Sequence, residues 1–285
     1  MSVDKVTVIG AGTMGAGIAQ VCATAGSSVV LSDVSQEFLD RGMSGITAFL
    51  DKGVAKGKTT PEQKDAVLSR LRTELVLEDA VRDADLVIEA VPEKMELKRD
   101  LFGRVSAACS GEAVLATNTS SLSLGAIFEG IKGPGRCLGM HFFNPPPLMP
   151  LLEVVRTAAT DQGVLDSVLD YARALGKDPI VVKDSPGFAT SRLGVVLGLE
   201  AIRMVEEDVA APADIDKALE LGYRHPMGPL RLTDLVGLDV RMAIADYLKV
   251  ELSSPAFEVP QLMRDMVAEG KLGKKSGQGF YNWES

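Results

Sequence analysis

A histidine and a glutamate on either side of a proline run are the residues best suited to acid–base chemistry. His141 follows the apolar segment Cys137–Met140, and Glu153 follows the turn Pro145-Pro146-Pro147. An imidazole exchanges a proton near neutral pH, and a carboxylate beside it fixes its tautomer and stabilises the imidazolium. A structural histidine bonded inside a core is the plainer interpretation. The glycine motif described next favours general-base catalysis by His141.

A glycine-rich turn near the start of the chain predicts a dinucleotide site. The apolar run Val6–Ile9 leads straight into the pattern G-x-G-x-x-G. The first glycine of such a pattern permits a tight turn, the second lets the backbone approach a pyrophosphate, and the third lets the helix pack against the strand. Free N–H groups at the helix start favour the phosphates. A packing loop or another nucleotide-like ligand is the alternative. The residues expected around the pyrophosphate are Gly10, Gly12, Thr13, Met14 and Gly15.

An acidic residue at the end of the second predicted strand favours NAD as the cofactor. Asp33 follows Val29–Ser32, about twenty residues beyond the glycine motif. Its carboxylate would accept hydrogen bonds from the ribose hydroxyls and repel a 2′-phosphate. The next arginine is Arg41, too far along the chain to accommodate that phosphate. NAD is therefore expected rather than NADP.

Polar side chains also follow the predicted strand Ala113–Thr117. Asn118 and Ser120 lie where this strand ends, and such groups at the carboxyl edge of an α/β sheet can bind a nicotinamide or a substrate oxygen. The same residue types are preferred helix N-caps, here for a helix that starts near Leu122, and both roles can coexist. The second histidine, His225, precedes a proline in a predicted loop and is interpreted as structural.

Short β-rich runs alternate with helical stretches through the first two thirds of the chain. This alternation predicts an α/β fold with an open, doubly wound, Rossmann-like sheet. Several runs are almost entirely apolar, as expected of parallel strands buried on both faces. Helices are expected at Gly15–Ala25 and Gly163–Leu175, and at Pro61 with Thr60 as its cap. The predicted strands are Val6–Ile9, Ser28–Ser32, Asp85–Ala90, Ala113–Thr117, Leu138–Phe142, Leu152–Arg156 and Pro179–Val182.

The pattern changes after Asp184-Ser185-Pro186-Gly187. Apolar residues at helical spacing run from Phe188 to Glu207, and strand signals nearly vanish beyond them. The sequence therefore predicts an NAD-binding domain over residues 1–184 and a smaller all-α domain over residues 185–285. The other helices expected there are Asp214–Leu221, Leu230–Leu238, Arg241–Lys249 and Val259–Glu269.

Composition narrows the class of protein. The 285 residues are 46% apolar and 24% charged, with a net charge of −9, which argues against nucleic-acid binding. No apolar run reaches the length of a membrane span. The first predicted strand follows the N-terminus at once, so no signal peptide and a cytoplasmic location are expected. Cys22, Cys109 and Cys137 are widely spaced and lack a CxxC pattern, so reduced packing thiols and no metal site are expected.

With these motifs the chain resembles the L-3-hydroxyacyl-CoA dehydrogenase family, of the short bacterial 3-hydroxybutyryl-CoA dehydrogenase type. The resemblance implies NAD-dependent oxidation of a 3-hydroxyacyl-CoA to the 3-oxoacyl-CoA, and the reverse reduction, in fatty acid metabolism. It also implies an acyl-CoA substrate, a helical domain that closes over the sheet, and a homodimer. The motifs that carry it span essentially the whole chain in order: GAGTMG, ATNTSSL, GMHFFNPPPLMPLLEVV, KDSPGF, LGYRHPMGPLRLTDLVGLD and GKKSGQGFY.

The resemblance implies a role for individual residues. His141 matches the catalytic base, Glu153 its partner, and Ser120 a contact of the substrate's 3-oxygen. Asn144 matches the asparagine of the HFFNP motif. The positions that match contacts to NAD are Asp33, Glu93, Lys98, Asn118 and Lys275.

Two further positions concern the acyl-CoA. Lys56 matches a lysine near the CoA phosphates, with Lys52 as a helper, although by residue type alone both would belong to a solvated helix face. In the family motif D-S/T-P-G-F-x-x-N-R, this chain carries Ser191 in place of the asparagine near the thioester. A serine is shorter and lacks the amide's donor and acceptor pair, so a weakened or re-routed substrate contact is expected.

Two other functions fit part of these observations. One is a related dehydrogenase of a small hydroxy acid or sugar acid, which would share the base but show no effect of CoA on binding. The other is a crystallin-like protein that binds a dinucleotide without catalysis. The presence of His141, Glu153 and Ser120 together weighs against the latter.

Overall fold

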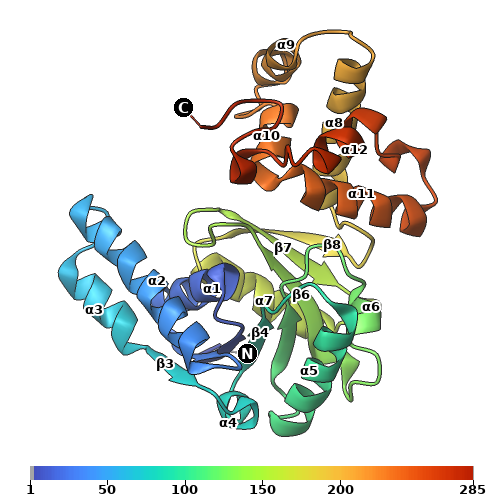
Figure 1. Ribbon diagram of the computed structural model, residues 1–285. Helices are drawn as coiled ribbons and strands as arrows, with labels where there is room; N and C mark the ends of the chain where they lie inside the picture. The colour runs from blue at the N-terminus through green and yellow to red at the C-terminus, as the bar shows by residue number, and fades with distance from the viewer. Residues whose placement is uncertain (1–2, 285) are drawn as a thin grey trace. The chain divides into compact units, whose positions relative to one another are not determined.

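The protein is described by a computed structural model covering residues 3–284. The chain divides into two compact units, with the boundary between Ser185 and Pro186 (Figure 1). The first unit combines a sheet with helices on its faces, and the second is helical. The α/β class expected from the sequence, followed by a helical domain, is confirmed.

The first unit is built on an eight-stranded sheet with the order β3-β2-β1-β4-β5-β6-β7-β8. All neighbouring strands run parallel except β6 and β7, which are antiparallel. The strand order reverses at β1, which lies between β2 and β4, and such a reversal is where open α/β sheets bind ligands. The strands are β1 (Lys5–Ile9), β2 (Ser28–Ser32), β3 (Leu71–Glu74), β4 (Leu86–Glu89), β5 (Val114–Thr117), β6 (Cys137–Phe142), β7 (Leu151–Arg156) and β8 (Asp178–Lys183).

Each strand predicted from the sequence is present to within one residue at either end. The prediction missed β3, which is a short edge strand of sequence LRTE with only one apolar residue. Strand β8 is exposed or only partly buried along its length. This strand lies at the other edge of the sheet.

Helices cover both faces of the sheet (Figure 1). Helices α1, α2 and α7 share one hydrophobic core with the strands, while α4, α5 and α6 pack together on the opposite face. In β1, Val6 and Val8 join the first core, and the Thr7 hydroxyl between them donates to Ala80 O at 2.6 Å on the other face. The helical elements are α1 (Thr13–Thr24), α2 (Gln36–Ala55), α3 (Pro61–Ser69), α4 (Leu77–Val81), α5 (Met95–Ala108), α6 (Leu124–Ile127), the 3-10 turn η1 (Pro134–Arg136) and α7 (Gln162–Ala174).

The start of α3 follows the predicted capping pattern. The Thr60 hydroxyl accepts a hydrogen bond from Gln63 N at 3.2 Å, and the Gln63 side chain accepts from Thr60 N at 2.9 Å. This reciprocal arrangement satisfies two N–H groups that the helix leaves unpaired. Pro61 stands at the first helical position, where its missing N–H costs nothing.

The second unit packs its helices around a separate apolar core. Its C-terminal segment is held by Asp234, which is fully buried and accepts hydrogen bonds from Phe280 N, Tyr281 N and Trp283 Nε1, each at 2.9 Å. The helix expected at Asp214–Leu221 is an α-helix that continues as a π-helix. The helical elements are α8 (Thr190–Glu206), α9 (Pro212–Lys217), the π-helix η2 (Ala218–Gly222), α10 (Pro229–Val236), α11 (Leu238–Leu252), η3 (Pro255–Phe257), α12 (Gln261–Ala268) and η4 (Lys274–Ser276).

Candidate active site

The antiparallel pairing of β6 and β7 places a histidine directly opposite a glutamate. In this register His141 faces Glu153, and His141 Nδ1 lies 2.7 Å from Glu153 Oε2. The glutamate is fully buried and the histidine is 6% exposed. Because the carboxylate holds Nδ1, the neutral ring carries its proton there and leaves Nε2 as the basic nitrogen. The predicted return of Glu153 to His141 across the proline turn is confirmed.

The glycine turn has the close approaches that its motif predicts. Gly10 has φ of +102°, and a Cβ there would lie 2.6 Å from Ala90 O. A Cβ on Gly15 would lie 1.7 Å from Gly10 O, so the start of α1 can pack against the turn only with glycine. The space beside Gly12 is open within 4 Å, which leaves its backbone accessible to a ligand.

These residues fit the pyrophosphate and ribose of NAD. No side chain caps the start of helix α1 at Thr13. Uncapped N–H groups at a helix start favour the binding of phosphates. Asp33 is anchored beside them, because its two carboxylate oxygens accept hydrogen bonds from Ala11 N and Val34 N, both at 2.6 Å. A groove of about 380 Å³ opens next to the turn, between α1, α2 and the proline run at residues 145–147.

The ends of β5 and β6 are tied together at the same edge of the sheet. Asn118 Oδ1 accepts a hydrogen bond from Phe142 N at 2.8 Å, one residue beyond His141. Ser120 N donates to Glu93 Oε1 at 2.9 Å, which links the loop after β5 to the loop after β4. The structure therefore brings Asn118, Ser120 and Glu93 to the edge of the sheet where β6 presents His141.

The helix cap expected in this loop lies further along the chain. Helix α6 begins at Leu124, and Ser123 is its N-cap, accepting from Ala126 N at 3.4 Å. The segment before it is instead held by the Thr119 hydroxyl, which accepts from Leu122 N at 3.0 Å. The expectation of a helix starting near Leu122 was therefore wrong by two residues.

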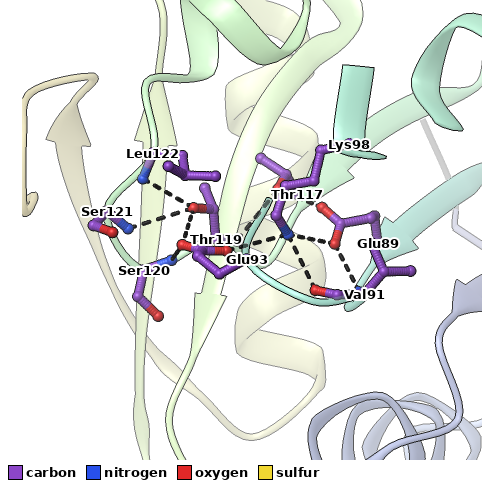
Figure 2. Close-up of polar contacts among 9 residues, drawn as sticks. All are labelled: Glu89, Val91, Glu93, Lys98, Thr117, Thr119, Ser120, Ser121 and Leu122. Atoms are coloured by element: carbon purple, nitrogen blue, oxygen red, sulfur yellow. Dashed lines mark hydrogen bonds and ion pairs between the residues drawn. The ribbon is translucent and has the colours of Figure 1, made fainter. Parts of the chain in front are cut away.

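Lys98 lies inside the protein rather than at the surface of the site. It is 1% exposed, and its ammonium contacts Glu89 Oε1 at 2.5 Å and Glu93 Oε2 at 3.3 Å (Figure 2). Sequence reasoning missed Glu89, which is fully buried at the end of β4. An acidic residue that ends the apolar run Leu86–Ile88 was the available signal, since a buried carboxylate requires a partner.

The remaining predicted residues are distributed between the two units. Asn144 is exposed two residues beyond β6, and Lys52 and Lys56 are exposed at the end of α2. Lys275 and Ser191 belong to the second unit.

Two structural absences concern residues 3–284. No helix in this range is long and apolar enough to cross a bilayer. No group of three or more His, Cys, Asp or Glu side chains in this range is arranged to hold a metal ion.

Comparison with known proteins assigns both units to one family. Residues 5–185 match the model of the 3-hydroxyacyl-CoA dehydrogenase NAD-binding domain, and residues 187–283 match that of the C-terminal domain. The chain is 42% identical to a 3-hydroxybutyryl-CoA dehydrogenase of Mycobacterium tuberculosis, over 99% of both proteins. It is 43% identical to a 3-hydroxyadipyl-CoA dehydrogenase of Escherichia coli, over all of this chain and 60% of that protein.

A solved structure agrees over the full length. The (S)-3-hydroxybutyryl-CoA dehydrogenase PaaH1 of Ralstonia eutropha superposes with a TM-score of 0.95 at 37% identity, covering 100% of both chains. The chain therefore belongs to the 3-hydroxyacyl-CoA dehydrogenase family and is an NAD-dependent oxidoreductase of 3-hydroxyacyl-CoA substrates.

Proposed function

We propose that this chain interconverts L-3-hydroxybutyryl-CoA and acetoacetyl-CoA, with His141 as the general base and acid. The observation that carries the proposal is the bond of 2.7 Å between His141 Nδ1 and Glu153 Oε2. The short-chain substrate is supported by two relatives that are named for 3-hydroxybutyryl-CoA. The relative named for 3-hydroxyadipyl-CoA makes a longer, acidic acyl group the competing substrate.

In the oxidation direction, His141 Nε2 takes the proton of the substrate's 3-hydroxyl. Glu153 then faces an imidazolium, and its fully buried carboxylate stabilises that charge in a site of low dielectric. Bound NAD supplies the hydride acceptor for the hydrogen on C3. In the reduction direction the same imidazolium returns the proton to the 3-oxygen.

Other side chains of the first unit hold the reactants. Ser120 holds the 3-oxygen, and Asn144 belongs to the HFFNP motif that carries the base. Asp33 binds the ribose of NAD, and Glu93 also contacts NAD. Lys52 and Lys56 are exposed and one helical turn apart, a spacing that presents both ammonium groups to the CoA phosphates. These assignments rest on the match to the family motifs together with the exposure of the lysines.

The second unit supplies Ser191 and Lys275 to the substrate and the cofactor, and forms a homodimer. Support for the dimer comes from α8, where Leu193 is 61% exposed and Leu197 is 43% exposed, one turn apart on the same side of the helix. Light scattering on the purified protein tests this point. A monomer at micromolar concentration would contradict it.

The test of the proposed function compares two histidine variants. His141→Gln should slow the reduction of acetoacetyl-CoA by NADH about a hundredfold to ten-thousandfold, the usual contribution of a general acid–base group. His225→Gln is the matched control, since the second histidine is only partly buried in the second unit and should leave the rate unchanged. A His141→Gln enzyme with more than half the wild-type rate would remove this residue from the mechanism.

The substrate is tested by a series of acyl groups. Acetoacetyl-CoA should be reduced with a higher kcat/KM than 3-oxoadipyl-CoA or medium-chain 3-oxoacyl-CoAs. Equal turnover of free acetoacetate would favour a dehydrogenase of small hydroxy acids. No turnover of any of these compounds, with NADH still bound, would favour a non-catalytic protein.

A further inference from the structure

Two carboxylates and one ammonium form a chain of ion pairs where β4 ends (Figure 2). Glu89, the last residue of β4, is fully buried, and Lys98 in the first turn of α5 is 1% exposed. The Lys98 ammonium lies 2.5 Å from Glu89 Oε1 and 3.3 Å from Glu93 Oε2. It also donates to Val91 O at 3.4 Å. Three protein oxygens therefore surround the Lys98 ammonium.

The outer carboxylate connects this chain to the loop that carries Ser120. Glu93 Oε1 accepts hydrogen bonds from Ser120 N, at 2.9 Å, and from the Thr119 hydroxyl. The inner carboxylate is held on its other side by the Thr117 hydroxyl at 2.7 Å. Glu93 is 39% exposed, in contrast to the enclosed Glu89 and Lys98. It is therefore the member of the chain that faces the site.

The charges of the chain do not cancel. Two carboxylates and one ammonium leave a net charge of −1, and the ammonium lies closer to the inner carboxylate than to the outer one. Within residues 3–284, no other lysine or arginine forms an ion pair with Glu89 or Glu93. The uncompensated negative charge is therefore concentrated on Glu93.

We propose that Glu89 is a positioning residue that draws Lys98 away from Glu93, so that the charged Glu93 favours the oxidised cofactor over the reduced one. The nicotinamide ring carries a positive charge in NAD⁺ and none in NADH. A carboxylate near the ring therefore lowers the Kd for NAD⁺ relative to that for NADH. The inference rests on the assignment of Glu93 to NAD in the proposed function. It gives Lys98 an indirect role, through Glu93, in place of a direct contact.

The test measures the Kd of NAD⁺ and of NADH separately, by calorimetry, without substrate. Glu89→Gln preserves the shape of the side chain but brings the net charge of the chain to zero. The ratio of the Kd for NAD⁺ to that for NADH should then rise on the order of fivefold. Glu93→Gln, at a partly exposed position that tolerates the change, should raise the ratio in the same direction. Glu96→Gln is the matched control, because Glu96 is exposed in the first turn of the same helix, and it should leave the ratio unchanged.

A double variant separates charge from structure. Glu89→Gln combined with Lys98→Met removes the inner pair and leaves Glu93 with its charge, so the net charge is again −1. The ratio should return to the wild-type value, which a purely structural role of Glu89 would not produce. An unchanged ratio in Glu89→Gln and Glu93→Gln, or a double variant that behaves like Glu89→Gln, overturns the proposal. Failure of the wild-type protein to bind either cofactor would instead contradict its assignment as an NAD enzyme.

Discussion

Replacing Glu153 by glutamine tests the central pair most directly. The change keeps the length and volume of a side chain that is fully buried opposite His141 in the β6–β7 pair. It removes the negative charge that stabilises the imidazolium. A glutamine that turns its NH₂ toward Nδ1 would also move the ring proton to Nε2, where it blocks the base.

The expected loss can be estimated from the geometry. With Nδ1 and Oε2 2.7 Å apart, the centres of the two charged groups lie about 4 Å apart, and such charges attract by about 4 kcal/mol at an effective dielectric constant of about 20. Glutamine retains a neutral hydrogen bond, which offsets about 1 kcal/mol of that loss. A loss of about 2–3 kcal/mol of transition-state stabilisation corresponds to a roughly 30- to 150-fold lower kcat.

The assay is steady-state reduction of acetoacetyl-CoA, with the Kd of NADH and the thermal unfolding temperature measured in parallel. The reasoning requires kcat to fall while the Kd of NADH stays within about twofold of wild type. Glu112→Gln is the control, because Glu112 is exposed in the loop before β5. A Glu153→Gln enzyme with kcat within threefold of wild type would refute the electrostatic role. Equal losses of turnover and of NADH binding would assign Glu153 a structural role.

Three further outcomes are expected. Asp33→Ala should lower the preference for NADH over NADPH about tenfold or more, because the Asp33 carboxylate next to the 2′-phosphate of NADPH costs several kcal/mol. A wild-type enzyme that already prefers NADPH would contradict the assignment of Asp33 to the ribose. Gly103→Ala in α5 should stabilise the fold by about 0.5–1 kcal/mol, since the space around Gly103 is open within 4 Å. Gly17→Ala should instead lower the unfolding temperature, because the added Cβ would lie 2.8 Å from the ring of Pro146. Unfolding temperatures that move in the same direction in both variants would argue against the contact with Pro146. Burial raises the pKa of Cys22 to about 12, so only about one Cys22 thiol in ten thousand is ionised at pH 8. Iodoacetamide should therefore label Cys22 only after the protein unfolds. Labelling of the native protein at the rate of a free thiol would show that the structure around Cys22 opens.

Much of the site follows from local sequence features. The glycine turn is specified by spacing alone, because Gly10 and Gly15 meet backbone that excludes any other residue. The His141–Glu153 pair could be anticipated because a short proline-rich connection returns the chain to the neighbouring strand. The apolar strands were located to within one residue at each end, since they lie in the buried layer where side-chain pattern and structure agree.

The direction of β7 also follows from the sequence. The connection between β6 and β7 covers residues 143–150, and a crossover to a parallel strand needs about a dozen residues or more. The two strands therefore have to be antiparallel. That direction places His141 and Glu153 at the same level of the sheet, which a parallel neighbour reached through a helix would not ensure.

The chain Glu89–Lys98–Glu93 could not be predicted, because spacing does not reveal which of several charged residues is enclosed. The segment from Glu89 to Lys98 carries five charged side chains, and only the first and last are buried. Their burial depends on the neighbouring strand β5, whose last residue, Thr117, pairs with Glu89 and donates its hydroxyl to the Glu89 carboxylate. Because Glu93 holds Ser120 with one oxygen and meets Lys98 with the other, the proposed cofactor and substrate contacts share one support. Substitutions that disturb the contact between Glu93 and Lys98 should therefore alter the KM for acetoacetyl-CoA as well as the binding of NAD, although NAD and the acyl-CoA touch different residues.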